Sequence, residues 1–437
     1  DIHWADASTL ELIDRVISRI ESLQILLIAT HRPEFVPSWA GQRQASVMTL
    51  ARLSTREQKK LIAAVAGGSL AGKAIDEIAE RADGVPLFVE ELTKATIEAG
   101  GETEETLARS AGMAAIPATL HASLMARLDR LGPVARSVAQ VGAVIGRDFS
   151  RDLLSAAWTG ALSDMDNALA HLRDAGLIFV RGEGDQASYL FKHALVQDAA
   201  YSTLLREPKQ ALHRAVATLL EQRKDATLIA ELIARHWRAA RESRRASEWW
   251  LTAGRAASEN SAHREAIESI QNGLAEIASL PETTMRKELE LELVIALTVP
   301  NVALYSFGSE EAREPIERSE ALSRELGRAR PAPLLFHRWL FHHGRNENEL
   351  ALPIARELEE SLKDHPLGVR ASHSRLQSEM HLGYDMNALT AEFRRVFDKV
   401  FSFGPEFDRL RFTYTYDFKA ICACGLSNAL WYSGHPD

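Results

Sequence analysis

The chain opens with Asp1-Ile2-His3-Trp4-Ala5-Asp6-Ala7-Ser8-Thr9-Leu10, and a second informative stretch follows at Ile28-Ala29-Thr30-His31-Arg32-Pro33-Glu34-Phe35. Between them, Ser8 and Glu11 have the spacing of a helix capping box, which predicts a helix there. Residues 25–29 form a continuous apolar run, typical of a strand that is covered on both faces. A helix followed by such a strand predicts part of an α/β domain with a parallel sheet in residues 1–52.

The composition is that of a globular protein with more than one domain. A length of 437 residues corresponds to roughly three domains. The 46% hydrophobic and 25% charged residues exclude a disordered or collagen-like chain. The net charge of −9 gives no overall attraction to nucleic acid or to anionic membranes. Two closely spaced cysteines, no apolar run of about 18 residues and no secretory leader predict a cytoplasmic protein without a membrane partner.

The middle of the chain is predicted to be mainly helical. Ser54-x-x-Glu57 is a second capping box, and Gly84-Val85-Pro86 separates two further helices. Residues 53–115, which end in a polar linker at 100–110, are predicted to form a helical domain. Residues 116–215 are predicted to hold short helices and then a hairpin of strands 177–180 and 189–191 around a turn at 181–185. Three helices followed by a hairpin is the layout of a winged helix.

Residues 216–437 are predicted to be an α-solenoid of helical repeats. Trp250, Ala253, Ala257, Ala266 and Ile270 recur at about the 34-residue period of tetratricopeptide repeats. Later helix pairs are expected near residues 286–327, 333–365 and 368–402. The final residues, 431–437, are similar to the turn between the two helices of a repeat, so the second helix of that last unit is expected to be missing.

The two opening stretches resemble the signal-transduction ATPases with numerous domains, the STAND ATPases. In that family a strand ends in two acidic residues followed by His-Trp-Ala-Asp. The resemblance implies that Asp1 is the second acid, which orients water, and that Arg32 senses the γ-phosphate of ATP. It also implies that the Mg²⁺-binding acid and the phosphate loop precede Asp1. This fragment is therefore expected to bind neither ATP nor ADP tightly.

Two further segments resemble the same family. Gly84-Val85-Pro86-Leu87-Phe88-Val89-Glu90-Glu91-Leu92 is similar to an element of the helical lid, which implies that Pro86 lies near the adenine. The other segment is Tyr189-Leu190-Phe191-Lys192-His193-Ala194-Leu195. Its resemblance to the family implies that His193 contacts the β-phosphate of ADP. The alternatives stay open: a solvated arginine at 32, an ordinary helix start at Pro86 and a core or helix-start histidine at 193.

Other features of the sequence do not indicate a site. Residues 67–74 have the spacing of a phosphate loop, but Ala74 stands where Ser or Thr must reach Mg²⁺, and a helix rather than a strand is expected before them. The third helix of the winged helix, near residues 161–176, is acidic, so direct nucleic-acid binding is not expected. The arginine run at 235–245 alternates with glutamates, which is typical of a solvated helix face. The Cys and His residues show no metal-ligand spacing.

Residues 407–417 and 422–437 are similar to those of bacterial proteins in which a class III adenylate/guanylate cyclase domain precedes the ATPase and the repeats. Tyr416 stands where those proteins usually have Gly. The resemblance implies a regulatory ATP/ADP switch and a repeat region that binds proteins or peptides, with nucleotide-dependent oligomerisation of the parent. A large LuxR-type transcription regulator and a repeat scaffold with an inactive ATPase remain alternatives.

Overall fold

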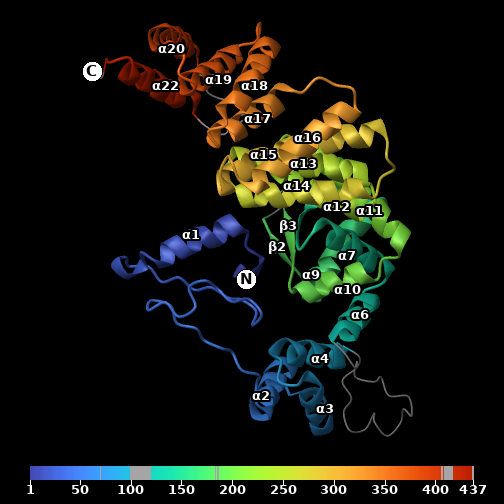
Figure 1. The fold of residues 1–437 in the computed structure, drawn as a ribbon. Coiled ribbons are helices and arrows are strands. Elements are labelled where there is room, and N and C mark those ends of the chain that lie inside the picture. Colours follow the sequence, from blue (N-terminus) through green and yellow to red (C-terminus); the bar gives the residue numbers. More distant parts are fainter. Residues whose placement is uncertain are drawn as a thin grey trace. The chain divides into compact units, whose positions relative to one another are not determined.

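The computed structural model describes residues 1–68, 70–98, 120–182, 184, 187–404, 407 and 417–435. These residues are mainly helical and divide into two compact units (Figure 1). One unit comprises Ala40–Arg223 with Ala239–Arg241. The other comprises Asp1–Trp39, Lys224–Arg238 and Glu242–Asp437.

The first of these units begins with a cluster of three helices, α2 (Thr55–Ala66), α3 (Gly72–Ala82) and α4 (Pro86–Glu98). The predicted capping box is confirmed, because the Ser54 hydroxyl accepts from the Glu57 N–H while the Glu57 carboxylate accepts from the Ser54 N–H. Apolar residues at helical spacing on all three helices form one small buried core.

A module of helices and a small sheet follows. Its elements are α6 (Leu120–Arg130), α7 (Pro133–Ile145), β1 (Asp148–Ser150), α8 (Arg151–Ala157), α9 (Leu162–Asp174), β2 (Ile178–Arg181), β3 (Ser188–Phe191), α10 (Ala194–Ser202) and α11 (Arg206–Glu221). The sheet is antiparallel in the order β1-β3-β2, with Tyr189 opposite both Phe149 and Val180. Both strands of the predicted hairpin are therefore present. Glu183 and Asp185 of its turn lie outside the described residues.

The second unit contains the repeat region. Its helices are η4 (Ala226–Ile229), α12 (Ala230–Ala239), α13 (Ser243–Glu259), α14 (His263–Ala278), α15 (Thr284–Tyr305), α16 (Glu310–Glu325), α17 (Ala332–Gly344), α18 (Asn348–Ser361), α19 (Gly368–His381), α20 (Met386–Phe401) and α22 (Phe418–Tyr432). From α13 to α20 each helix packs against the next one in the chain (Figure 1). The helix pairs predicted at 286–327, 333–365 and 368–402 are confirmed, with bounds that differ by a few residues.

One backbone cap recurs at the turns of this solenoid. Arg241, Ser261, Asn346, Gly383 and Gly434 each follow a helix with a positive φ between 60° and 84°. After each of them, the next N–H donates to a carbonyl five residues back, as in a Schellman motif. The turn predicted at residues 431–437 therefore has the geometry of the other repeat turns, although Pro436 and Asp437 lie outside the described residues.

Close helix packing in the solenoid depends on small residues. A Cβ added to Gly254 in α13 would lie 2.5 Å from the Ile270 side chain of α14, and one added to Gly273 would lie 2.8 Å from Leu293 of α15. Trp250 is almost fully buried between these helices. The Ala- and Gly-rich positions seen in the sequence thus allow neighbouring helices to approach closely.

The opening residues differ from the prediction in two respects. The strand predicted at 25–29 is wrong: residues 25–54 contain neither helix nor strand, and Leu26 and Ile28 are 84% and 79% exposed. A strand needs a paired neighbour, and the described residues place none beside this run. The helix α1 (Ala7–Ile17) is present, but Asp6 caps it in place of Ser8, because its carboxylate accepts from Thr9 N–H at 2.7 Å.

Two predicted features lie outside the described residues, the linker at 100–110 and most of segment 407–417. Among the helices that the structure describes, none combines the length and the apolar character that a membrane span requires.

Candidate functional site

Asp1 and Arg32 lie in the same short region of the chain. The Asp1 amino group donates to Thr30 Oγ1 at 3.0 Å, and Ile2 N–H donates to the Thr30 carbonyl at 2.9 Å. The Arg32 guanidinium lies 5.6 Å from the centre of the Trp4 ring, within the range of a cation–π contact. The two stretches that open the sequence are therefore joined side by side, although no sheet forms around them in the described residues.

Pro86 is the first residue of α4, and a strained turn sets its position. Asp83 and Gly84 both have positive φ, at 47° and 73°. A Cβ at Gly84 would lie 2.7 Å from the Leu53 carbonyl oxygen, and Leu53 N–H donates to the Gly84 carbonyl at 2.8 Å. Only glycine fits this close approach without strain. Pro86 itself is exposed, so its ring is accessible to a ligand.

His193 is the N-cap residue of α10, directly after β3. Its Nε2 is buried and has no hydrogen-bond partner among the described residues. Burial, followed by the positive charge of Lys192, lowers the pKa of His193, so the ring is neutral at pH 7. A buried ring nitrogen without a partner is uncommon and is suited to receive a polar ligand atom.

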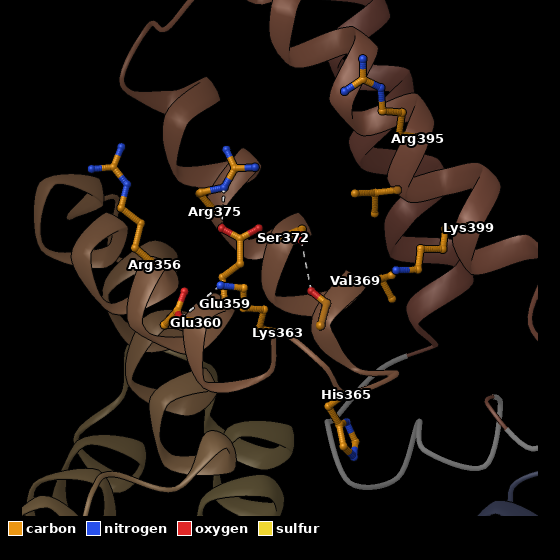
Figure 2. A pocket seen from close by; sticks show the side chains of 12 residues that line it. Arg356, Glu359, Glu360, Lys363, His365, Val369, Ser372, Arg375, Arg395 and Lys399 are labelled. Carbon is orange, nitrogen blue, oxygen red and sulfur yellow. Dashed lines mark hydrogen bonds and ion pairs between the residues drawn. The ribbon is translucent and has the colours of Figure 1, made fainter.

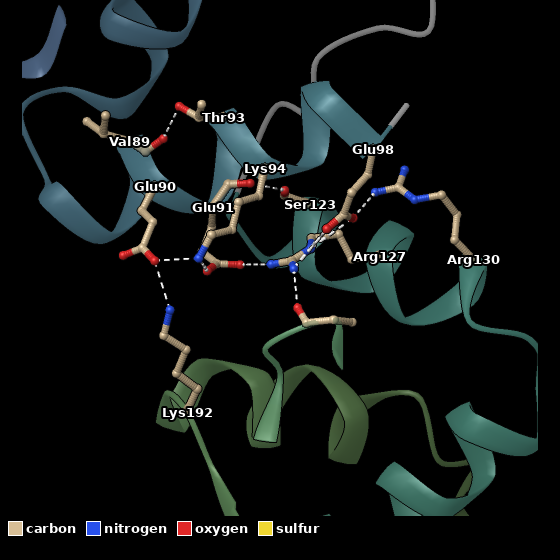
Figure 3. A network of polar contacts seen from close by, with 11 residues as sticks. Val89, Glu90, Glu91, Thr93, Lys94, Glu98, Ser123, Arg127, Arg130 and Lys192 are labelled. Atoms are coloured by element: carbon tan, nitrogen blue, oxygen red, sulfur yellow. Dashed lines mark hydrogen bonds and ion pairs between the residues drawn. The ribbon is translucent and has the colours of Figure 1, made fainter. Parts of the chain in front are cut away.

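The neighbours of His193 link it to the helix that Pro86 begins. Glu90, one turn after Pro86, accepts from Lys192 Nζ at 2.8 Å and also pairs with Lys94 (Figure 3). These hydrogen bonds from lysine lower the pKa of Glu90 to about 2. Pro86 and His193 therefore belong to elements of one unit that are joined by an ion pair, whereas Asp1 and Arg32 belong to the other unit.

A buried ion-pair network continues along α4, and the sequence analysis missed it. Arg127 of α6 and Glu91 of α4 are each 2% exposed, and they form an ion pair (Figure 3). Arg127 Nε also donates to both carboxylate oxygens of Glu98 at 3.0 Å, and its Nη2 donates to the Ala175 carbonyl at 2.7 Å. One guanidinium thus holds α4, α6 and the end of α9 together. The sequence indicates this pair only through the presence of one charged residue, Glu91 or Arg127, at a buried position of each of the two helices.

In the described residues, the segments at 67–74 and 235–245 have the local structure that the sequence predicts. Gly67 caps α2 in the left-handed region and Gly72 begins α3, so residues 67–74 connect two helices and follow no strand. In the arginine run, Arg235, Arg238 and Arg244 each form an ion pair with a glutamate. Cys422 and Cys424 are free thiols, and no group of metal-binding side chains occurs in the part of the chain that the structure describes.

Known proteins that are similar to this chain include one curated protein and one solved structure. No protein-family model matches the chain. A curated protein of Rhizobium meliloti (strain 1021), "Uncharacterized protein R02095", is 27% identical over 330 residues, which is 74% of this chain and 32% of that protein. The chain thus spans about a third of the length of this relative. A solved STAND protein with a tetratricopeptide repeat sensor, PH0952 from Pyrococcus horikoshii, is 11% identical with a TM-score of 0.37, covering 91% of this chain and 60% of that one. A structural similarity of this degree carries no argument about the present chain.

Proposed function

We propose that this chain is the regulatory region of a bacterial signalling protein of the STAND type, in which the helical repeats bind a protein or peptide partner. The stack of helix pairs from α13 to α20 carries this proposal. Stacked repeats bury a continuous core and leave an extended surface that is suited to binding another polypeptide. We assign partner binding to residues 216–437.

The other three segments form a nucleotide switch in this proposal. Residues 1–52 are the second half of an ATPase core, 53–115 its helical lid and 116–215 a winged helix. The element order α7-β1-α8-α9-β2-β3 and the strand order β1-β3-β2 support the winged-helix assignment. The hydrogen bond from Ile2 N–H to the Thr30 carbonyl supports the assignment of both opening stretches to one ATPase core.

The proposed nucleotide contacts in the intact protein are Asp1, Arg32, Pro86 and His193. His193 has the most specific support, because its buried, unpartnered Nε2 can donate a hydrogen bond to a phosphate oxygen of ADP. Exposed Arg32 and exposed Pro86 are accessible for contacts with phosphate and adenine. ATP with Mg²⁺ would supply the charge that distinguishes the active state from the ADP-bound resting state. The phosphate loop is not assigned to any residue of this chain.

We propose that the output is nucleotide cyclisation by a class III cyclase domain outside this chain, in the cytoplasm, with nucleotide-dependent oligomerisation of the parent protein. A LuxR-type transcription regulator is the alternative output. The acidic α9 does not support direct DNA reading by this chain, because Asp166 pairs with Arg151 and Arg173 pairs with Asp174. Assay of the parent protein for cyclic nucleotide formation and for operator binding distinguishes the two outputs.

Photo-crosslinking in growing cells tests the partner-binding proposal. A photoreactive phenylalanine analogue replaces Leu350 or Tyr384, which are 56% and 46% exposed in the repeat region. Leu205 and Phe179, 76% and 49% exposed in the other unit, are matched controls. We expect one defined protein adduct from the repeat positions and none from the controls. Adducts from the control positions alone would contradict the proposal.

Replacement of His193 by alanine in the parent protein tests the nucleotide switch. We expect less co-purified ADP and a higher basal output, because the phosphate loses a donor. His171→Ala, which removes an exposed histidine of the same unit, is the control and should leave both quantities unchanged. Unchanged ADP content in His193→Ala would favour a purely structural histidine.

A further inference from the structure

A pocket of about 630 Å³ lies within the repeat region, bordered by α18, the start of α19 and α20 (Figure 2). Its lining includes five arginine or lysine side chains and two glutamates. The whole chain carries a net charge of −9, so this local excess of positive charge is unusual for the molecule. The lining side chains used below are Arg356, Lys363, Arg375, Arg395 and Lys399, with His365 in the connection between α18 and α19.

The glutamates of the pocket are already neutralised by basic side chains. Glu359 accepts from Arg375 Nε at 2.8 Å, and Glu360 lies 3.6 Å from Lys363. Arg375 also binds Glu392 at 2.7 Å, and these neighbouring carboxylates keep its pKa above the usual value. Arg375 is therefore a structural cation whose charge is used within the protein.

Two other cations of the pocket have no carboxylate partner among the residues that the structure describes. Arg395 and Lys399 lie one turn apart on α20, so they share one face of that helix. Neither side chain makes a hydrogen bond or an ion pair with any residue that the structure describes, and both are exposed. Figure 2 shows both projecting from the helix that borders the pocket, across from the paired Glu359 and Glu360. His365 is exposed as well, and its Nδ1 accepts from Leu367 N–H at 3.1 Å, which leaves Nε2 for a ligand.

We propose that this pocket binds an acidic peptide segment of the partner protein, with carboxylates of the peptide paired to Arg395 and Lys399. This inference rests on the proposed partner-binding function and names the chemistry of the partner. Arginine binds a carboxylate through two parallel N–H donors, and lysine through a point charge, so adjacent acidic residues of a peptide match the pair.

A peptide fits this pocket better than a nucleotide or a phosphate. Phe, Tyr and Trp are missing from the lining residues that the structure describes, so among them only the exposed His365 ring could stack on a base. Arg395 and Lys399, the two cations without partners, lie one turn apart along α20, which suits carboxylates spaced along a chain better than one compact anion. An extended peptide can place its carboxylates along α20 and direct neutral groups toward α18. A volume of about 630 Å³ is sufficient for a few residues.

Fluorescence anisotropy on the full chain tests the proposal with a fluorescein-labelled peptide, Gly-Glu-Asp-Glu-Asp-Glu-Gly. We expect binding that weakens as salt is added, because the contacts are ionic. The double variant Arg395→Gln/Lys399→Gln should bind at least tenfold more weakly. The matched control, Arg394→Gln/Arg264→Gln, removes two exposed positive charges outside the pocket and should bind within twofold of the original chain.

A charge reversal keeps the test independent of any loss of folding. The variant Arg395→Glu/Lys399→Glu should bind the corresponding peptide with lysine at each acidic position, which the original chain should not bind. Recovery of binding through swapped charges requires a folded pocket.

Three results would overturn the inference. These are equal binding by the double variant and its control, no binding of the acidic peptide by the original chain, and displacement of the peptide by equimolar inorganic phosphate or ATP, which would indicate a general anion site. Adducts from Leu350 or Tyr384 in the crosslinking experiment would still support partner binding by the repeats. Failure of the pocket and failure of the proposed function are thus distinguishable.

Discussion

Removal of the buried Arg127 guanidinium should strongly destabilise the unit that contains α4 and α6. The change is Arg127→Met, which keeps most of the side-chain length and removes the charge. It leaves the Glu91 carboxylate, 2% exposed, without its ion-pair partner, and it leaves the Ala175 carbonyl without a donor. The loss of one partner of a buried ion pair costs about 3–5 kcal/mol. Lys94, 3.8 Å from Glu91, offsets only a small part of that loss.

The double variant Glu91→Leu/Arg127→Met should be more stable than Arg127→Met alone. Replacement of both charges by apolar groups removes the uncompensated carboxylate, and such replacements are often neutral or stabilising. Glu98 also loses Arg127, but it keeps Arg130 at 3.0 Å and is 36% exposed, so water can solvate it. The effects of the two substitutions should therefore not add, and the double-mutant cycle should show a coupling of about 2 kcal/mol or more.

The assay is urea denaturation combined with hydrogen exchange, because a chain with two units need not unfold in one step. Exchange should speed up in peptides from α4 and α6 of Arg127→Met, while peptides from α13 to α20 should stay unchanged. The reasoning is refuted if Arg127→Met costs less than about 1 kcal/mol, or if the double variant loses the sum of the two single losses.

Three further predictions concern other parts of the chain. Gly84→Ala should destabilise the first unit by about 1–3 kcal/mol more than Gly67→Ala, because both need positive φ but only Gly84 meets the Leu53 backbone; equal losses in urea denaturation would contradict this. His337 is fully buried with both ring nitrogens unpartnered, and burial lowers its pKa to about 4. As the pH falls below 6.5, His337 therefore takes up a proton in the unfolded chain but stays neutral in the folded chain. The free energy of unfolding that is present above pH 6.5 is lost at up to about 1.4 kcal/mol per pH unit as the pH falls toward 4. His337→Phe should stabilise the repeats at pH 7.5 and more so at pH 5.5, and equal urea-midpoint shifts at the two pH values would refute the titration. The purified chain should release no phosphate from ATP with Mg²⁺, since no residue supplies a phosphate loop; turnover that disappears in Lys73→Ala would reverse that conclusion.

The features that the sequence predicts correctly are those that depend on neighbours in the chain. The helix pairs of the repeats, the capping box at Ser54 and the two hairpin strands follow from local periodicity and local turn chemistry. The cap of α1 was predicted at the wrong residue because Asp6 and Ser8 are both favourable N-cap types. In the structure, both the Thr9 N–H and the Thr9 hydroxyl donate to the Asp6 carboxylate, so the helix begins after Asp6.

The features that the sequence does not predict depend on partners that are far away in the chain. The apolar run at 25–29 has the composition of a buried strand, yet composition does not supply the neighbouring strands that a sheet needs. The Glu91–Arg127 pair joins residues 36 positions apart, and the sequence shows only that both are charged. The free cations Arg395 and Lys399 are equally hidden, because a sequence does not reveal which of many arginines lack a carboxylate.

The ion pairs along α4 differ in strength in a way that bears on the proposed switch. Glu90 is 30% exposed and binds Lys192 next to His193, so water and salt weaken this pair and it breaks at low cost. Glu91, the next residue, is buried against Arg127, and separation of that pair costs several kcal/mol. If α4 moves relative to β3 and α10 in the proposed switch, the Glu90–Lys192 pair should therefore separate before the Glu91–Arg127 pair. Since Pro86 begins this helix and His193 adjoins Lys192, a nucleotide that contacted both residues, as proposed, would act on the weaker of the two pairs.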